Sequence, residues 1–115
     1  MQEGPVIAEP IPDEALVVRG GRNLPADIVR GTGTHPSGVT GVSVECAVGV
    51  SVAELAAAIP HGQIGVTTAG VVRQMGGDVV RTIGRSPYHA TVTGLTPEQI
   101  SGLLTPTIPT PTREV

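Results

Sequence analysis

Aromatic side chains and cysteines are nearly absent from this sequence. Among its 115 residues there is one tyrosine and one cysteine, and neither phenylalanine nor tryptophan occurs. A core must therefore be built from small aliphatic side chains, and a fully buried valine, leucine or isoleucine contributes only about 1.5–3 kcal/mol. The single Cys46 excludes an internal disulfide and a Cys-x-x-Cys motif, so folding does not require an oxidising compartment.

Lysine is also absent, because all seven basic residues are arginine, and the formal net charge is −3. Domains that wrap nucleic acid usually carry a basic face, so we expect no DNA partner. No apolar run approaches the ~20 residues of a membrane span, and the first 14 residues lack the basic and apolar regions of a secretory signal. We expect no membrane span, and any secretion to follow a non-Sec route.

The length fits one domain, and proline marks both of its ends. Residues 1–14 combine acidic residues with three prolines, which disfavours helix and predicts an extended leader. Residues 105–115 form a Pro/Thr-rich tail that should also run extended. The folded unit is therefore expected over residues 15–104.

Short β-branched runs with turn residues between them predict a small sheet. The segment before Gly20-Gly21 reads as a buried strand that ends at Arg19, and a bulge is expected between two apolar stretches near Val44 and Ala47. The expected strands are Ala15–Arg19, Val39–Val44 with its extension Ala47–Val50, Ile64–Thr67, Asp78–Ile83 and Tyr88–Thr93.

Capping patterns predict short helices between these strands. Ser51 and Glu54 have the spacing of a capping box before a helix over Val52–Ile59, and Thr67 or Thr68 can cap a second helix that stops at Gly76-Gly77. Thr96-Pro-Glu-Gln99 is a second capping box with proline at the first helical position, and Pro25–Arg30 has room for one or two helical turns. The expected fold is α+β: a small mixed or antiparallel sheet with two or three short helices on one side.

Histidines and arginines offer the first candidate sites. Cys46, His35, His61 and His89 have the side-chain types of a zinc site, but their spacings match no ligand pair, so we expect no metal. A metal-independent ribonuclease could use His89 with His35 or Glu45 for proton transfer, while Arg19 and Arg85 stabilise the phosphate.

A nucleotide-binding cleft is the third candidate. Arg19, at a strand end, could grip a phosphate with its forked guanidinium, and Gly20 would let that ligand approach the backbone. Ser43 would orient the ribose from the neighbouring strand. His89, on the late strand, would lie near the bond to be broken.

Three segments carry a resemblance to a known group of proteins. They are Val17-Val-Arg19-Gly-Gly21, Gly41-Val-Ser43-Val-Glu45 and the stretch from His89 to Gln99. In this order they resemble the toxin domains of bacterial polymorphic toxins of the type VI and Rhs kinds, and among these the ADP-ribosyltransferase-like effectors. Those proteins hold NAD with an early strand arginine or histidine and have a serine-centred second strand. They usually carry a glutamate on a late strand, where this chain has His89.

The resemblance implies an ADP-ribosyltransferase-like fold and an antibacterial toxin that transfers ADP-ribose from NAD to a protein or RNA in a target cell. It implies catalytic roles for Arg19, Ser43 and His89, and NAD contacts from Arg19, Gly20 and Ser43. A cognate immunity protein would be its partner, and it would act in the target-cell cytoplasm. Beside the ribonuclease, a non-enzymatic module that docks through its proline-rich arms stays open as an alternative.

Overall fold

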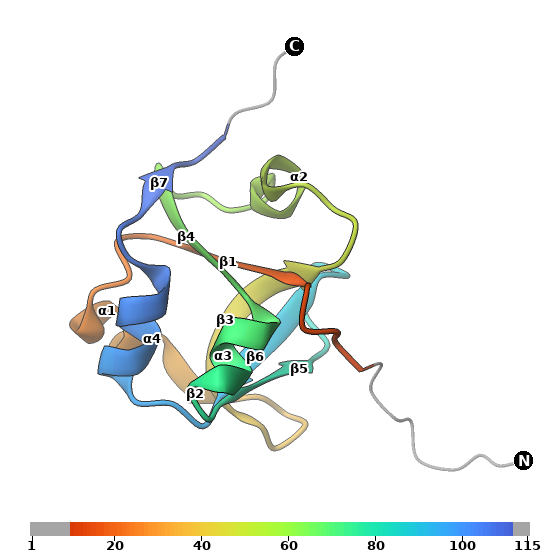
Figure 1. Cartoon of the computed structure of the whole chain (residues 1–115), viewed down its shortest axis with the longest axis vertical. Coiled ribbons are helices and arrows are strands. Elements are labelled where there is room, and N and C mark those ends of the chain that lie inside the picture. The colour runs from red at the N-terminus through yellow and green to blue at the C-terminus, as the bar shows by residue number, and fades with distance from the viewer. Residues whose placement is uncertain (1–9, 112–115) are drawn as a thin grey trace, which may run out of the picture.

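The computed structural model describes residues 10–111, and within this range the chain forms a seven-stranded antiparallel sheet and four short helices (Figure 1). The expected α+β class is confirmed, with more helices than expected. In chain order the elements are β1 (Leu16–Gly20), α1 (Pro25–Gly31), β2 (Thr32–Thr34), β3 (Thr40–Ala47), α2 (Val52–Ala56), β4 (Gln63–Thr68), α3 (Ala69–Gln74), β5 (Asp78–Arg81), β6 (His89–Thr93), α4 (Pro97–Leu104) and β7 (Ile108–Pro109).

The long strand β3 organises the sheet, whose order is β5-β6-β3-β1-β4-β7. On one side β3 pairs with β6. On the other side it pairs first with β2 and then with β1. The bulge expected near Val44 is wrong, because β3 is continuous from Thr40 to Ala47 and keeps an unbroken register with β1 and with β6. The expected extension to Val50 is also wrong, because the strand ends at Ala47. The alternating apolar residues Val42, Val44 and Cys46 of β3 are therefore all buried in the main core, and no extra residue is needed in the strand.

The helices cover both faces of the sheet. Val17 of β1 lies in the main core together with Ile28 of α1, Val72 of α3 and Ile100 of α4. Its neighbour Val18 points to the opposite face, because side chains alternate along a strand. There it packs in a second cluster that includes Leu55 and Ala56 of α2. The expectation that the helices lie on one side is therefore wrong for α2, which covers an apolar patch on the second face.

The predicted caps are present in three helices. The side chain of Ser51 accepts from the backbone N–H of Glu54 at 3.0 Å, and that of Thr68 accepts from Val71 at 3.3 Å. At α4, Thr96 and Gln99 exchange both bonds of the predicted capping box. Glu54 does not complete the first box: its carboxylate accepts from the Tyr88 hydroxyl at 3.0 Å, which ties α2 to the segment before β6.

The sheet and core extend past the folded unit expected over residues 15–104. Ile11 is buried in the main core, and Ile108 of β7 pairs with Ile64 of β4. Residues 1–9 of the expected leader and 112–115 of the expected tail lie outside the described residues. Within the described part of the chain, no helix is both long and apolar enough to span a membrane.

Candidate functional site

A break in the pairing of β3 creates the candidate site. Along one edge, β1 pairs with residues 45–47 of β3 and β2 pairs with residues 40–42. Ser43 and Val44 lie between these two partners. Two segments border them: Arg19-Gly20 at the end of β1, and Gly31 just before β2. We call this place the β3 notch.

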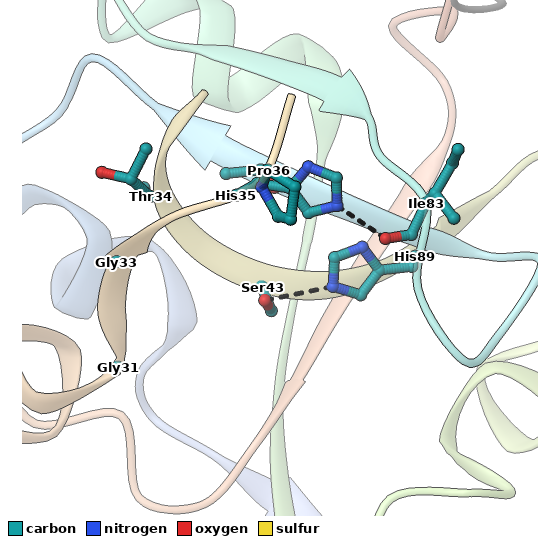
Figure 2. A pocket seen from close by; sticks show the side chains of 10 residues that line it. Gly31, Gly33, Thr34, His35, Pro36, Ser43, Ile83 and His89 are labelled. Atoms are coloured by element: carbon teal, nitrogen blue, oxygen red, sulfur yellow. Dashed lines mark hydrogen bonds between the residues drawn. The ribbon is translucent and has the colours of Figure 1, made fainter. Parts of the chain in front are cut away.

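Ser43 and His89 meet beside the notch. Ser43 pairs with Thr91 of β6 and Glu45 pairs with His89, so Ser43 and His89 are diagonal neighbours on the same face of the sheet. The Ser43 hydroxyl oxygen lies 3.1 Å from Nε2 of His89 (Figure 2). The structure thus joins two of the three predicted catalytic residues in one hydrogen bond.

The other ring nitrogen of His89 faces Thr82, which directly follows β5. Nδ1 lies 2.8 Å from the Thr82 hydroxyl and 3.3 Å from the Thr82 carbonyl oxygen. The hydroxyls of Thr82 and Thr91 are in turn 3.0 Å apart and buried. The His89 ring therefore has a hydroxyl partner on each side, and a serine hydroxyl next to an oriented imidazole is a common arrangement for proton transfer.

His35 lies next to His89, and their ring centroids are 5.9 Å apart. It belongs to the turn between β2 and β3. Nδ1 of His35 accepts from the backbone N–H of Ser37 at 3.0 Å, so Nε2 carries the proton and donates to the carbonyl of Ile83 at 2.6 Å. The close-up shows this bond fastening the turn to the segment after β5 (Figure 2). Both nitrogens of His35 are thus committed to the backbone.

Together these side chains line a cavity of about 290 Å³ that is open to solvent. Serine and threonine hydroxyls, two imidazoles and several glycines make up its wall. We call it the Ser–His cavity. Its lining residues are Gly31, Gly33, Thr34, His35, Pro36, Gly41, Ser43, Ile83, His89 and Thr91.

Arg19 lies in a neighbouring cavity of about 400 Å³ rather than beside Ser43. Strand alternation places its Cβ on the face opposite to Ser43, because Arg19 follows Val18, which pairs with Glu45. Of the other two residues predicted to contact NAD, Gly20 lines the same cavity, whereas Ser43 lines the Ser–His cavity. We call it the arginine cavity. It is lined by Arg19, Gly20, Gly21, Arg22, Asp27, Arg30, His61, Gly62 and Gln63.

Asn23 holds the Arg19 side chain in place. Its carboxamide oxygen accepts from Nη1 of Arg19 at 2.8 Å, and its amide donates to the carbonyls of Arg19 and Gly21. Asn23 is fully buried and takes a left-handed backbone conformation, φ 59°. Partial burial lowers the pKa of Arg19, and nearby Asp27 opposes that shift. The guanidinium remains charged and pre-oriented.

Gly31 borders both the Ser–His cavity and the Arg19 side chain. It lines the Ser–His cavity, and Nη2 of Arg19 packs so closely against it that a Cβ at this position would collide with the guanidinium. Gly31 is therefore close both to the Arg19 guanidinium and to the cavity of the Ser43–His89 pair.

The remaining candidates are dispersed. Glu45 is the cross-strand partner of His89, whereas His61 lines the arginine cavity and exposed Arg85 lines neither cavity. Cys46 is buried, and burial raises the pKa of its thiol. No group of three histidine, cysteine, aspartate or glutamate side chains within residues 10–111 is placed to hold a metal ion.

Sequence reasoning missed Thr82 and Asn23. Thr82 carries no motif, and its role depends on the turn that brings β5 back against β6. Asn23 had one available signal, since asparagine is enriched at left-handed positions such as a turn after two glycines.

Comparison with protein-family models, curated proteins and solved structures gives no match for this chain. Its function is therefore argued from the geometry of the two cavities.

Proposed function

We propose that this chain cleaves NAD at the bond between nicotinamide and ribose and transfers the ADP-ribose to a macromolecule. The observation that carries the proposal is that Gly31 lines the cavity of the Ser43–His89 pair and lies against the guanidinium of Arg19, which lines a second cavity. In this proposal NAD passes over Gly31 and contacts both groups. NAD has the matching division: an anionic pyrophosphate in the middle and a reactive glycosidic bond at one end.

The arginine cavity suits the pyrophosphate. Arg19, Arg22 and Arg30 line it against a single acid, Asp27, which pairs with Arg30. This local excess of positive charge occurs on a chain whose net charge is negative. A guanidinium can bind phosphate oxygens through two parallel hydrogen bonds, and Gly20 has no side chain to keep the ligand from the backbone.

The Ser–His cavity suits the reacting end. In the proposed step the bond between ribose C1′ and the nicotinamide nitrogen breaks, and neutral nicotinamide leaves with the electron pair. The acceptor's nucleophilic atom bonds to C1′ and gives its proton to Nε2 of His89, which later releases it to water. Ser43 turns its hydroxyl from His89 to the ribose, which orients the sugar and frees Nε2.

The same proposal includes the biological setting implied by the sequence resemblance. An ADP-ribosyltransferase-like toxin would be delivered into a recipient cell by a non-Sec route, modify protein or RNA in its cytoplasm, and be neutralised by an immunity protein. This chain has His89 on the late strand where those proteins usually have a glutamate, and this difference changes the chemistry expected there. An imidazole supplies a base there, in place of the carboxylate that the resembling proteins usually have.

A metal-independent ribonuclease is the second candidate, and the proximity of His35 to His89 favours it. Two imidazoles can divide the roles of acid and base in phosphodiester cleavage. Both nitrogens of His35, however, bond to the backbone, so His35 would have to leave Ser37 or Ile83 before it could serve. NAD transfer needs only a rotation of the Ser43 hydroxyl, and we place it first.

Inducible expression in a bacterial host tests the proposal. Cells carrying the wild type, Arg19→Ala or the exposed-arginine control Arg85→Ala receive NAD labelled in its adenylate part after permeabilisation. We expect growth arrest and label in protein or RNA for the wild type and the control, with both lost in Arg19→Ala. Arrest with fragmented RNA and no label would select the ribonuclease. Absence of arrest together with absence of label in every strain would contradict both enzymes and favour the binding module.

A further inference from the structure

Thr82 contacts His89 through three of its own groups. Its backbone N–H donates to the His89 carbonyl at 3.3 Å, while its hydroxyl and its carbonyl oxygen both lie near the imidazole Nδ1. The residue is 6 % exposed. Thr82 is therefore fixed on the backbone of β6 and shielded from competing water.

The partners of the ring decide where its proton resides. A carbonyl oxygen can only accept, so the nitrogen 3.3 Å from the Thr82 carbonyl must carry the hydrogen. With the proton on Nε2 instead, the lone pair of Nδ1 would face the lone pairs of that carbonyl. Nδ1–H then donates to Thr82, the Thr82 hydroxyl donates to Thr91, and the unprotonated Nε2 accepts from Ser43.

We propose that Thr82 is a positioning residue that fixes His89 in the tautomer protonated at Nδ1 and so directs the lone pair of Nε2 towards Ser43 and the Ser–His cavity. The effect of Thr82 on catalysis rests on the proposed function, but the tautomer of His89 does not depend on that function. Thr82 acts through His89 and has no contact with substrate in this account.

The backbone after Thr82 supports this placement. A Cβ at Gly84 would lie 2.5 Å from Cγ of His89 and 2.7 Å from its Cδ2, so the chain passes directly against the imidazole. The ring is thereby held from three directions: Thr82 at Nδ1, Ser43 at Nε2 and the backbone of Gly84 against its ring atoms. A ring held in this way loses little orientational freedom when a ligand arrives.

The test compares Thr82→Val, which removes the hydroxyl at nearly constant shape, with Thr82→Ser, which keeps it. Histidine ring nitrogens are labelled with ¹⁵N, and long-range proton–nitrogen correlations are recorded at about pH 8.5, where ordinary imidazoles are neutral. The His89 signals are assigned from their loss in His89→Gln. His35 is an internal control, because its contacts require the opposite tautomer, protonated at Nε2.

We expect His89 to be protonated at Nδ1 in the wild type and in Thr82→Ser. In Thr82→Val the Nδ1–H loses its hydroxyl acceptor at 2.8 Å and keeps only the contact with the backbone carbonyl at 3.3 Å, so we expect a shift towards a tautomer mixture. When nicotinamide release from NAD by the purified protein is measured, kcat should fall about tenfold in Thr82→Val with KM unchanged. Thr82→Ser should have the kcat of the wild type. A wild-type His89 protonated at Nε2 overturns the proposal even if Thr82→Val does not fold. A folded Thr82→Val with the wild-type tautomer overturns the role given to the Thr82 hydroxyl in fixing the ring. An expected tautomer without NAD turnover would instead remove the proposed function and leave Thr82 its structural role.

Discussion

The Ser43 hydroxyl lies 3.1 Å from Nε2 of His89, although 46 positions separate the two residues in the chain. Their contact follows from the register of β3 with β6, which pairs Ser43 with Thr91 and places His89 one diagonal step away. Both strands are central and well packed, so the pair stands on a rigid part of the fold. The end of α1, strand β2, the turn that bears His35 and the segment after β5 complete its surroundings.

Substituting Gly31 tests whether the two cavities act together. In Gly31→Ala the new Cβ should displace the Arg19 guanidinium without disturbing Ser43 or His89, because the methyl group would occupy the place of Nη2. We expect KM for NAD to rise about tenfold with kcat nearly unchanged. The control is Gly102→Ala on α4, where a Cβ meets no atom within 4 Å. If the two variants had equal KM values for NAD, Arg19 would have no role in substrate binding.

Asn23 should support both the fold and the arginine cavity. Asn23→Ala removes three hydrogen bonds and places alanine at a φ of 59°, so we expect the free energy of unfolding in urea to fall by about 2–3 kcal/mol. Asn23→Gly removes the same bonds but tolerates that φ, and should lose less. Both variants should weaken NAD binding equally, measured by calorimetry. Wild-type affinity in either would contradict the role assigned to the carboxamide.

Gly41 should be essential for the pairing of β3 with β6. A Cβ there would collide with the backbone carbonyl of Val92, which cannot move without breaking the sheet. We expect Gly41→Ala to lower the free energy of unfolding by about 1–3 kcal/mol, as overpacking does. Chemical denaturation of Gly41→Ala and the Gly102→Ala control measures the difference. An unchanged midpoint would show that the strands can separate locally at no cost.

Cys46 should be inert in the folded protein. Burial raises the pKa of its thiol above the ordinary value of 9.0, while Arg81 and Arg73 oppose the shift. A raised folded-state pKa contributes stability below pH 9.0, and this contribution is lost as the pH rises towards the folded value. We therefore expect slow alkylation near neutral pH and a free energy of unfolding that falls above pH 9.0 more steeply in the wild type than in Cys46→Ala. Rapid alkylation of the native protein would contradict the burial.

Local sequence signals predicted most of the fold. The caps at Ser51, Thr68 and Thr96 mark helix starts correctly, because side-chain capping is decided within a few residues. The short strands β2 and β7 escaped prediction, since Thr32–Thr34 is fully exposed and Ile108–Pro109 lies in a proline-rich segment. Their strand character comes from pairing with β3 and β4, which no local pattern contains.

The candidate site was only partly predictable for the same reason. Strand patterns placed Arg19 at a strand end and Ser43 and His89 on strands, but their distances depend on strand order and register. The order brings β3 beside β6, which joins Ser43 to His89, while alternation turns Arg19 to the other face. Gly31, which lines the Ser–His cavity and lies against the Arg19 guanidinium, is an ordinary helix-ending glycine in the sequence.

Nicotinamide release by the purified chain tests the central claim most directly. NAD is supplied with and without a bacterial lysate as acceptor, and free nicotinamide is followed by chromatography for the wild type, His89→Gln, Ser43→Ala and the Arg85→Ala control. We predict release by the wild type and the control, a loss of about 10²-fold or more in His89→Gln, and a smaller loss in Ser43→Ala. No release by the wild type in either condition, or equal release by His89→Gln, would contradict the account.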